Sequence, residues 1–231
     1  MRKRRASTLL AIMGMFALSI SAHRGQTSQS SSSESILKRT ALTRRDKVST
    51  TNALTTALST AAVPGGIATI TYCSADIEYV FPSSGPTLEN ALRAIRSTNP
   101  QYKWSVREGL VNIFPANGDP ALLKLRLSRL YITNAPSIDE AANQVFSMPE
   151  VRKRIIELNL SRGFTRLGMS DLKRPGSTSE PGERHYTLNL ANVTVREALN
   201  AIARAHGKGV WEYKERHCNG KADFQIQFLV R

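Results

Sequence analysis

Apolar residues recur at helical spacing in several stretches of the chain. The clearest stretch lies near the C-terminus, where four apolar residues occupy positions i, i+3, i+4 and i+7: Val195, Ala198, Leu199 and Ile202. This spacing predicts a helix with one face against a core. Thr194 precedes the helix and Glu197 follows three residues later, which predicts a capping box.

Comparable patterns predict four earlier helices. Three of them begin near Ser49, Thr87 and Ser137, and the last two of these residues are typical helix caps. The fourth begins at Pro149, a favourable first helical residue, and extends to about Leu160.

Strands are predicted between these helices, where β-branched residues cluster or apolar and polar residues alternate. The predicted extended segments are residues 67–72, 77–81, 102–106, 110–114, 125–132, 186–190, 210–213 and 224–228. Asn219 and Gly220 predict a hairpin turn before the last of them. The first half therefore has the order helix, strand, strand, helix, strand, strand.

The pattern of the first half returns in the second half. Three pairs of residues align without a gap at an offset of 107 positions: Thr87 with Thr194, Ile95 with Ile202, and Trp104 with Trp211. A shared helix cap, helix face and following tryptophan indicate an internal duplication rather than a solenoid with a short period. Equivalent positions also favour core packing over ligand stacking for the two tryptophans.

These elements predict an α+β fold of two small modules, in which amphipathic helices pack on short sheets. The first module covers residues 47–116. The second covers residues 117–231 and includes a helical insertion and an exposed loop at 173–184. The boundary lies in the Pro, Asn, Gly and Asp residues between Pro115 and Pro120.

The N-terminal residues 1–22 resemble a secretory signal peptide. Four basic residues at 2–5 precede an apolar run over 8–20, and small residues follow. This run is 13 residues long, whereas a membrane-spanning helix needs about 20. We expect export to the periplasm or cell envelope of a bacterium, with an uncleaved membrane anchor as the alternative. Residues 23–46 are serine-rich and predict a disordered linker.

The chain is strongly basic, with 32 Lys and Arg against 18 Asp and Glu, a net charge of +14. Loss of the four basic residues at 2–5 would leave +10. The remaining basic residues are mostly scattered and no aromatic residues lie among them, so nucleic acid is not an expected partner. Two cysteines, Cys73 and Cys218, permit one disulfide in an oxidising compartment. We favour two free, buried thiols and keep the disulfide as the alternative.

We find no catalytic, cofactor-binding or metal-binding set, and we expect a protein that is not an enzyme. The histidines at 23, 185, 206 and 217 form no cluster in the sequence, and the His217–Cys218 pair lacks a second pair at metal-ligand spacing. His206 is expected at a helix C-terminus, where a cation is favourable. Three glutamates, at 89, 140 and 197, fall in the first turns of helices, where capping or the helix dipole explains them.

The first half is similar to the secretin/TonB short N-terminal domain. The similar segments are residues 52–58 leading to Gly65–Gly66, residues 85–92, residues 102–104 and residues 108–113. A divergent copy of the Thr-Leu-x-x-Ala-Leu helix occurs in residues 188–199. The resemblance implies small periplasmic α/β modules that contact other proteins. Neither a β-barrel nor a secretin channel follows in the sequence, so we expect no receptor or gating function.

We therefore predict an exported, non-enzymatic docking or scaffolding module that binds another envelope protein. One way to do so is to accept a strand at an exposed sheet edge. The alternative is a basic module that binds nucleic acid, peptidoglycan or anionic lipid. An exported enzyme is a third hypothesis, which clustering of Glu197, His206 and His217 around one pocket would favour. Self-association is compatible with all three hypotheses, and membrane contact is expected only if the N-terminal segment is uncleaved.

Overall fold

The computed structural model describes residues 33–41, 47–73, 78–80, 87–163 and 185–229. The predicted signal peptide and the predicted loop at 173–184 lie outside the described residues. In the first half, the elements are β1 (Lys47–Ser49), α2 (Thr50–Thr60), β2 (Gly65–Tyr72), β3 (Glu78–Val80), α3 (Leu88–Thr98), β4 (Tyr102–Arg107) and β5 (Leu110–Pro115). The predicted order of helices and strands from α2 to β5 is confirmed.

Relative to the elements from α2 to β5, the second half has one additional described helix, α5 (Pro149–Glu157). Its elements are β6 (Arg126–Ala135), α4 (Ile138–Ser147), α5 (Pro149–Glu157), β7 (Leu160–Arg162), β8 (Tyr186–Thr194), α6 (Val195–His206), β9 (Val210–Cys218) and β10 (Lys221–Leu229). The sequence pattern did not predict β7, which pairs over only three residues. The α+β fold class is confirmed.

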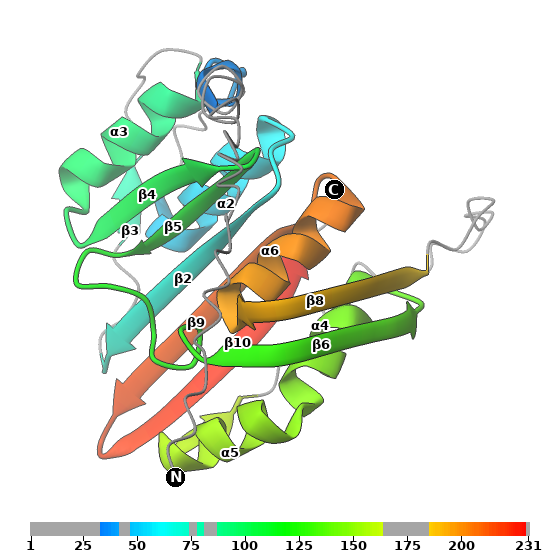
Figure 1. The fold of residues 1–231 in the computed structure, drawn as a ribbon. Helices are drawn as coiled ribbons and strands as arrows, with labels where there is room; N and C mark the ends of the chain where they lie inside the picture. The colour runs from blue at the N-terminus through cyan, green and yellow to red at the C-terminus, as the bar shows by residue number, and fades with distance from the viewer. Residues whose placement is uncertain (1–32, 42–46, 74–77, 81–86, 164–184, 230–231) are drawn as a thin grey trace, which may run out of the picture.

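One mixed sheet of six strands crosses the molecule in the order β4-β5-β2-β9-β10-β7 (Figure 1). The halves are less separate than two modules with their own sheets, because β2 of the first half pairs with β9 of the second. This parallel junction runs over eight residue pairs, from Gly65–Val210 to Tyr72–His217. Two-stranded antiparallel ribbons, β1–β3 and β6–β8, complete the sheets in the described part of the chain.

The two halves have the same topology. Each half begins with a strand of a two-stranded ribbon, followed by a helix and then by a sheet strand. That sheet strand pairs in parallel with the second strand of the hairpin that ends the same half: β2 with β5, and β7 with β10. The register also agrees. Gly65, the first residue of β2, pairs with Val111, the second residue of β5. Leu160, the first residue of β7, likewise pairs with Ala222, the second residue of β10. The extra helix α5 is the main departure from the repeat.

The halves bury their helices on opposite faces of the sheet. The first core contains buried residues of α2, α3 and one face of β2 and β5, including Leu58, Leu92 and Ile67. The second core contains α4, α6 and the ribbon β6–β8 against the other face, including Leu199 and Trp211. Opposite faces are expected, because β9 runs antiparallel to β4 through the shared sheet, so the second half is turned over relative to the first.

Side-chain caps begin four of the helices where the sequence predicts them. The hydroxyl groups of Ser49, Thr87 and Ser137 each accept a hydrogen bond from a first-turn N–H. A complete capping box forms at Thr194: its hydroxyl accepts from the Glu197 N–H at 3.2 Å, and the Glu197 carboxylate accepts from the Thr194 N–H at 2.7 Å. Gly207 ends α6 in the left-handed conformation, with φ of 89°.

Part of the predicted linker packs against the first half. Residues 33–37 are helical, and Ile36 and Ala41 are buried with the first core. A backbone bridge joins Thr40 to Thr87, the cap of α3. The many serines in residues 23–33 led to the prediction of a linker, and Ile36 and Ala41 were not recognised as core residues. Residues 23–32 and 42–46 lie outside the described part of the chain.

Candidate docking surface on the β4–β5 hairpin

The β4–β5 hairpin forms one end of the six-stranded sheet. Its two-residue turn is made by Glu108 and Gly109, with φ of 49° and 80°, the conformation that suits a tight hairpin. Six residue pairs join the strands, from Tyr102–Pro115 to Arg107–Leu110. The outer edge of β4 has no neighbouring strand among the described residues. It therefore presents backbone groups that can pair with another strand.

The free edge of β4 is the counterpart of an edge that is filled within the chain. In the repeat, β4 corresponds to β9, and Trp104 to Trp211. The outer edge of β9 receives β2 in parallel, whereas that of β4 receives nothing among the described strands. Among the described strands, the same kind of edge is thus paired in one half and open in the other.

The backbone of β4 alternates between donors to β5 and donors to the open edge. In an antiparallel ladder, alternate residues exchange hydrogen bonds with the partner strand. Pro115 lacks an N–H and faces Tyr102, so Tyr102, Trp104 and Val106 belong to the pairs that do not exchange these bonds. The N–H groups of Trp104 and Val106 consequently point away from β5.

One face of the hairpin borders a cavity of about 490 Å³ beside α6. Its floor includes the buried Leu110 and the half-buried Phe114 of β5, with Leu190 and Val193 of β8 alongside. The opposite wall belongs to α6, where Asn200 and two arginines face the hairpin. Both halves of the chain build this groove, and we call it the β5–α6 groove.

Three arginines line the β5–α6 groove, and two of them are neutralised by acidic side chains. Arg196 lies 2.5 Å from the Asp119 carboxylate, and Arg204 lies 2.5 Å from that of Glu108. Arg107 of β4 is exposed and forms no ion pair with the described residues. Arg107 is therefore the arginine of the groove that has no acidic partner among the described residues.

Asn112 lies in the floor of the same groove with an unsatisfied side chain. It is 5% exposed, and its Oδ1 atom is buried with no hydrogen-bond partner. A buried polar atom without a partner costs roughly 1–3 kcal/mol. Its neighbour across the hairpin is Ser105, so Arg107 lies diagonally from it on the same face. The sequence did not single out Asn112, because it is one polar residue between the core residues Val111 and Ile113 of a strand.

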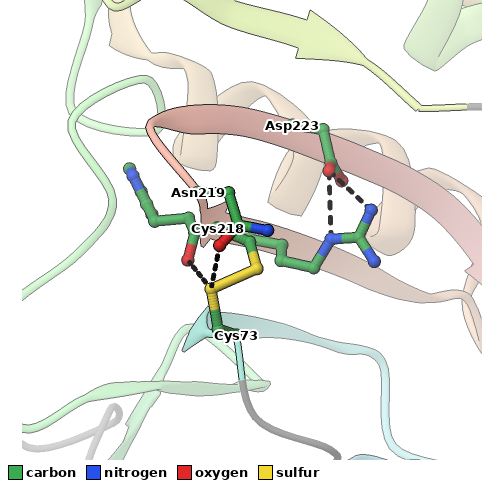
Figure 2. Close-up of a disulfide and its surroundings, with 6 residues drawn as sticks. Cys73, Cys218, Asn219 and Asp223 are labelled. Carbon is green, nitrogen blue, oxygen red and sulfur yellow. Dashed lines mark hydrogen bonds and ion pairs between the residues drawn. A yellow bond between two sulfur atoms is a disulfide. The ribbon is translucent and has the colours of Figure 1, made fainter.

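A disulfide joins the two central strands at one end of the junction (Figure 2). Cys73 follows β2, Cys218 ends β9, and the Cα atoms are 4.7 Å apart across 145 positions of sequence. The preference for two free, buried thiols was therefore wrong. The pairing of Tyr72 with His217 explains the bond, because it places the next residues of two parallel strands side by side. Sequence spacing alone contained no information about this register.

A buried carboxylate lies on β9 near the disulfide. Glu215 is 6% exposed and accepts a hydrogen bond from the Tyr213 hydroxyl at 2.6 Å. Its other oxygen lies 2.7 Å from Nε2 of His217, whose ring stacks on Tyr72. Burial, followed by the charge of Glu215, raises the pKa of Tyr213. The sequence did not indicate this cluster, although residues two apart on a strand share a face.

The residues that would favour an enzyme lie apart. Glu197 lines the β5–α6 groove, whereas His217 borders a shallow depression beside Cys218. His206 lies at the end of α6, where its ring stacks on Tyr186. His185 is exposed, and His23 lies outside the described residues.

The three glutamates in the first turns of helices take part in helix capping to different extents. Glu197 completes the capping box of α6, and the hydrogen bond from the Thr194 N–H is the main reason that its pKa is lowered. Glu140 donates only its backbone N–H to Ser137. Glu89 pairs with Arg93 at 2.7 Å, an exposed i,i+4 pair.

The described residues contain no group of three or more His, Cys, Asp or Glu side chains placed to hold a metal ion. None of the helices that the structure describes is long and apolar enough to span a bilayer.

Comparison with known proteins returns no match: no family model, no curated protein and no solved structure is similar to this chain. The similarity to the secretin/TonB short N-terminal domain therefore stays a prediction from the sequence.

Proposed function

We propose that this protein is an exported docking module of the bacterial envelope that binds a partner protein by accepting one of its strands at the outer edge of β4. The observation that carries the proposal is the β2–β9 junction. In that junction β9, the counterpart of β4 and the first strand of the second hairpin, pairs in parallel with β2. The partner strand would then run parallel to β4, as β2 runs along β9.

Charge favours a partner strand with acidic side chains. Lys103 and Arg107 are exposed and alternate along one face of β4. Charged residues of one sign on an edge disfavour pairing between identical edges. They favour an incoming strand of opposite charge, since opposite charges across neighbouring strands contribute roughly 0.2–1 kcal/mol each. Backbone hydrogen bonds would supply affinity, and these side chains would supply selectivity.

The edge can be blocked with one substitution. Val106→Pro removes an N–H that points away from β5, so it should abolish partner binding while leaving the ladder to β5 intact. Val106→Ala is the matched control, because it removes similar packing and keeps the N–H. We would place a photo-crosslinking residue at Lys103 and compare the crosslinks in cells. Loss of the crosslink in Val106→Pro alone supports the proposal; equal crosslinking in all three proteins rejects it.

Helix α5 supports a second candidate, binding to an anionic surface. Arg152 and Lys153 are exposed, and Ile156, about one turn further along the helix, is 78% exposed. Basic side chains around an exposed apolar residue are typical of contact with anionic lipid. Sedimentation with anionic vesicles tests this candidate. Binding that falls steeply with salt, and that Ile156→Ser weakens, would favour it over strand docking.

A further inference from the structure

The β5–α6 groove has the composition of a ligand site rather than of a packing defect. An empty cavity in a protein is normally apolar, but this groove combines an apolar floor with an unsatisfied amide and a free cation. Leu110, Phe114, Leu190 and Val193 supply the apolar surface. Asn112 and Arg107 supply the polar groups, and neither has a described partner for the group in question. The groove lies on the face of the hairpin, so the backbone edge of β4 is not part of it; Arg107 is common to the two surfaces.

The unsatisfied groups define the ligand's chemistry. A primary amide such as that of Asn112 presents one acceptor and one donor direction, which matches the N–H and C=O of an amide in a ligand. A guanidinium such as that of Arg107 pairs best with a carboxylate, through two parallel hydrogen bonds. The two residues are diagonal neighbours across the hairpin, which corresponds to roughly 7–8 Å between their Cα atoms. One small molecule can reach both.

We propose that the β5–α6 groove binds an organic carboxylate that also carries an amide. The carboxylate pairs with Arg107, the amide hydrogen-bonds to Asn112, and a methyl group or short apolar side chain contacts Leu110 and Phe114. Acylated amino acids, peptide termini and acetamido sugar acids share this chemistry. Arg196 and Arg204 take no direct part, because Asp119 and Glu108 already neutralise them.

Four probes separate the two polar groups and distinguish an acylated amino acid from an acetamido sugar acid. N-acetylalanine carries both groups, propionate carries only the carboxylate, and N-acetylalaninamide carries only amides. N-acetylmuramic acid carries both groups on a sugar. Binding to the purified chain would be followed by NMR titration and calorimetry. We expect N-acetylalanine or N-acetylmuramic acid to bind about tenfold or more tightly than the two truncated probes, and the preferred one of the pair identifies the source.

Variants assign the contacts. Arg107→Gln and Asn112→Leu should each weaken binding about tenfold, and Arg107→Lys should retain more affinity than Arg107→Gln. Lys103→Gln is the control, because Lys103 is exposed on the same strand but does not line the groove. Val106→Pro, which blocks strand docking, should leave ligand binding unchanged, so the two proposals fail separately. The inference is overturned if no probe shifts groove resonances at millimolar concentration, or if Arg107→Gln or Asn112→Leu binds like the wild type.

Discussion

The indole ring of Trp211 lies against the backbone of Gly66 on the neighbouring strand. The two residues are paired in the β2–β9 junction, and a Cβ atom built on Gly66 would approach Cε2 of the ring to 1.9 Å. Nε1 of the same ring donates a hydrogen bond to Asn200 on α6 at 2.9 Å. The tryptophan is thereby held in one orientation, and only glycine fits beneath it. The halves of the chain meet at this contact.

Gly66→Ala should destabilise the protein by about 1–3 kcal/mol, the usual cost of overpacking a core. Chemical unfolding measures the change. Trp211→Leu removes the ring atoms that the new methyl group would meet, at its own cost in packing and in the bond to Asn200. We therefore expect the double variant Gly66→Ala/Trp211→Leu to be more stable than the sum of the single changes implies. Additive losses would show that the ring does not clash with the added methyl group.

The disulfide should stabilise the junction from its other end. Cys73 and Cys218 close a loop of 145 positions, and removal of such a bond typically costs about 2–5 kcal/mol. The double variant Cys73→Ser/Cys218→Ser should unfold at lower denaturant concentration than the oxidised wild type. Reduction of the wild type should produce a similar shift, whereas reduction of the double variant should produce none. Unchanged stability on reduction would contradict a structural role for the bond.

The capping box of α6 should contribute stability that depends on pH. The pKa of Glu197 is lowered in the folded protein from its ordinary value of 4.5, mainly by the hydrogen bond from the Thr194 N–H. A lowered folded pKa means that the ionised form stabilises the fold above the unfolded pKa, and that this contribution is lost as pH falls through the folded pKa. Glu197→Gln should therefore be less stable than wild type at pH 7 and approach it in acid. A difference that is the same at both pH values would refute this.

Asn112→Leu should raise the free energy of unfolding by about 1 kcal/mol, because it replaces a buried, unpartnered oxygen with an apolar group of similar shape. Positions that bind ligands are often not optimal for stability. Thermal unfolding without ligand measures the change, and Ser105→Ala, on the paired position of β4, is the control. A destabilised Asn112→Leu protein would indicate that the amide has a structural role instead.

Local patterns predicted the helices, most strands and their order, because caps and apolar spacing act within one element. Thr87, Ser137 and Thr194 cap helices as expected. These local patterns did not predict which segments, distant in the sequence, contact one another. The β2–β9 pairing and the Cys73–Cys218 bond depend on register across 145 positions of sequence, and the short strand β7 depends on pairing with β10, 62 positions later. The groove depends on that same assembly, since the β2–β9 pairing places α6 beside the first hairpin.

The most direct test of strand docking is the order of crosslinks along β4. Photo-crosslinking residues placed singly at Lys103 and Arg107 in the full chain would be used in cells, and the crosslinked peptides of the partner mapped. We predict that both sites crosslink one extended acidic segment, that position 103 contacts residues N-terminal to those contacted by position 107, and that Val106→Pro abolishes both crosslinks. Crosslinks in the reverse order, to unrelated segments, or unaffected by Val106→Pro would contradict parallel strand addition at β4.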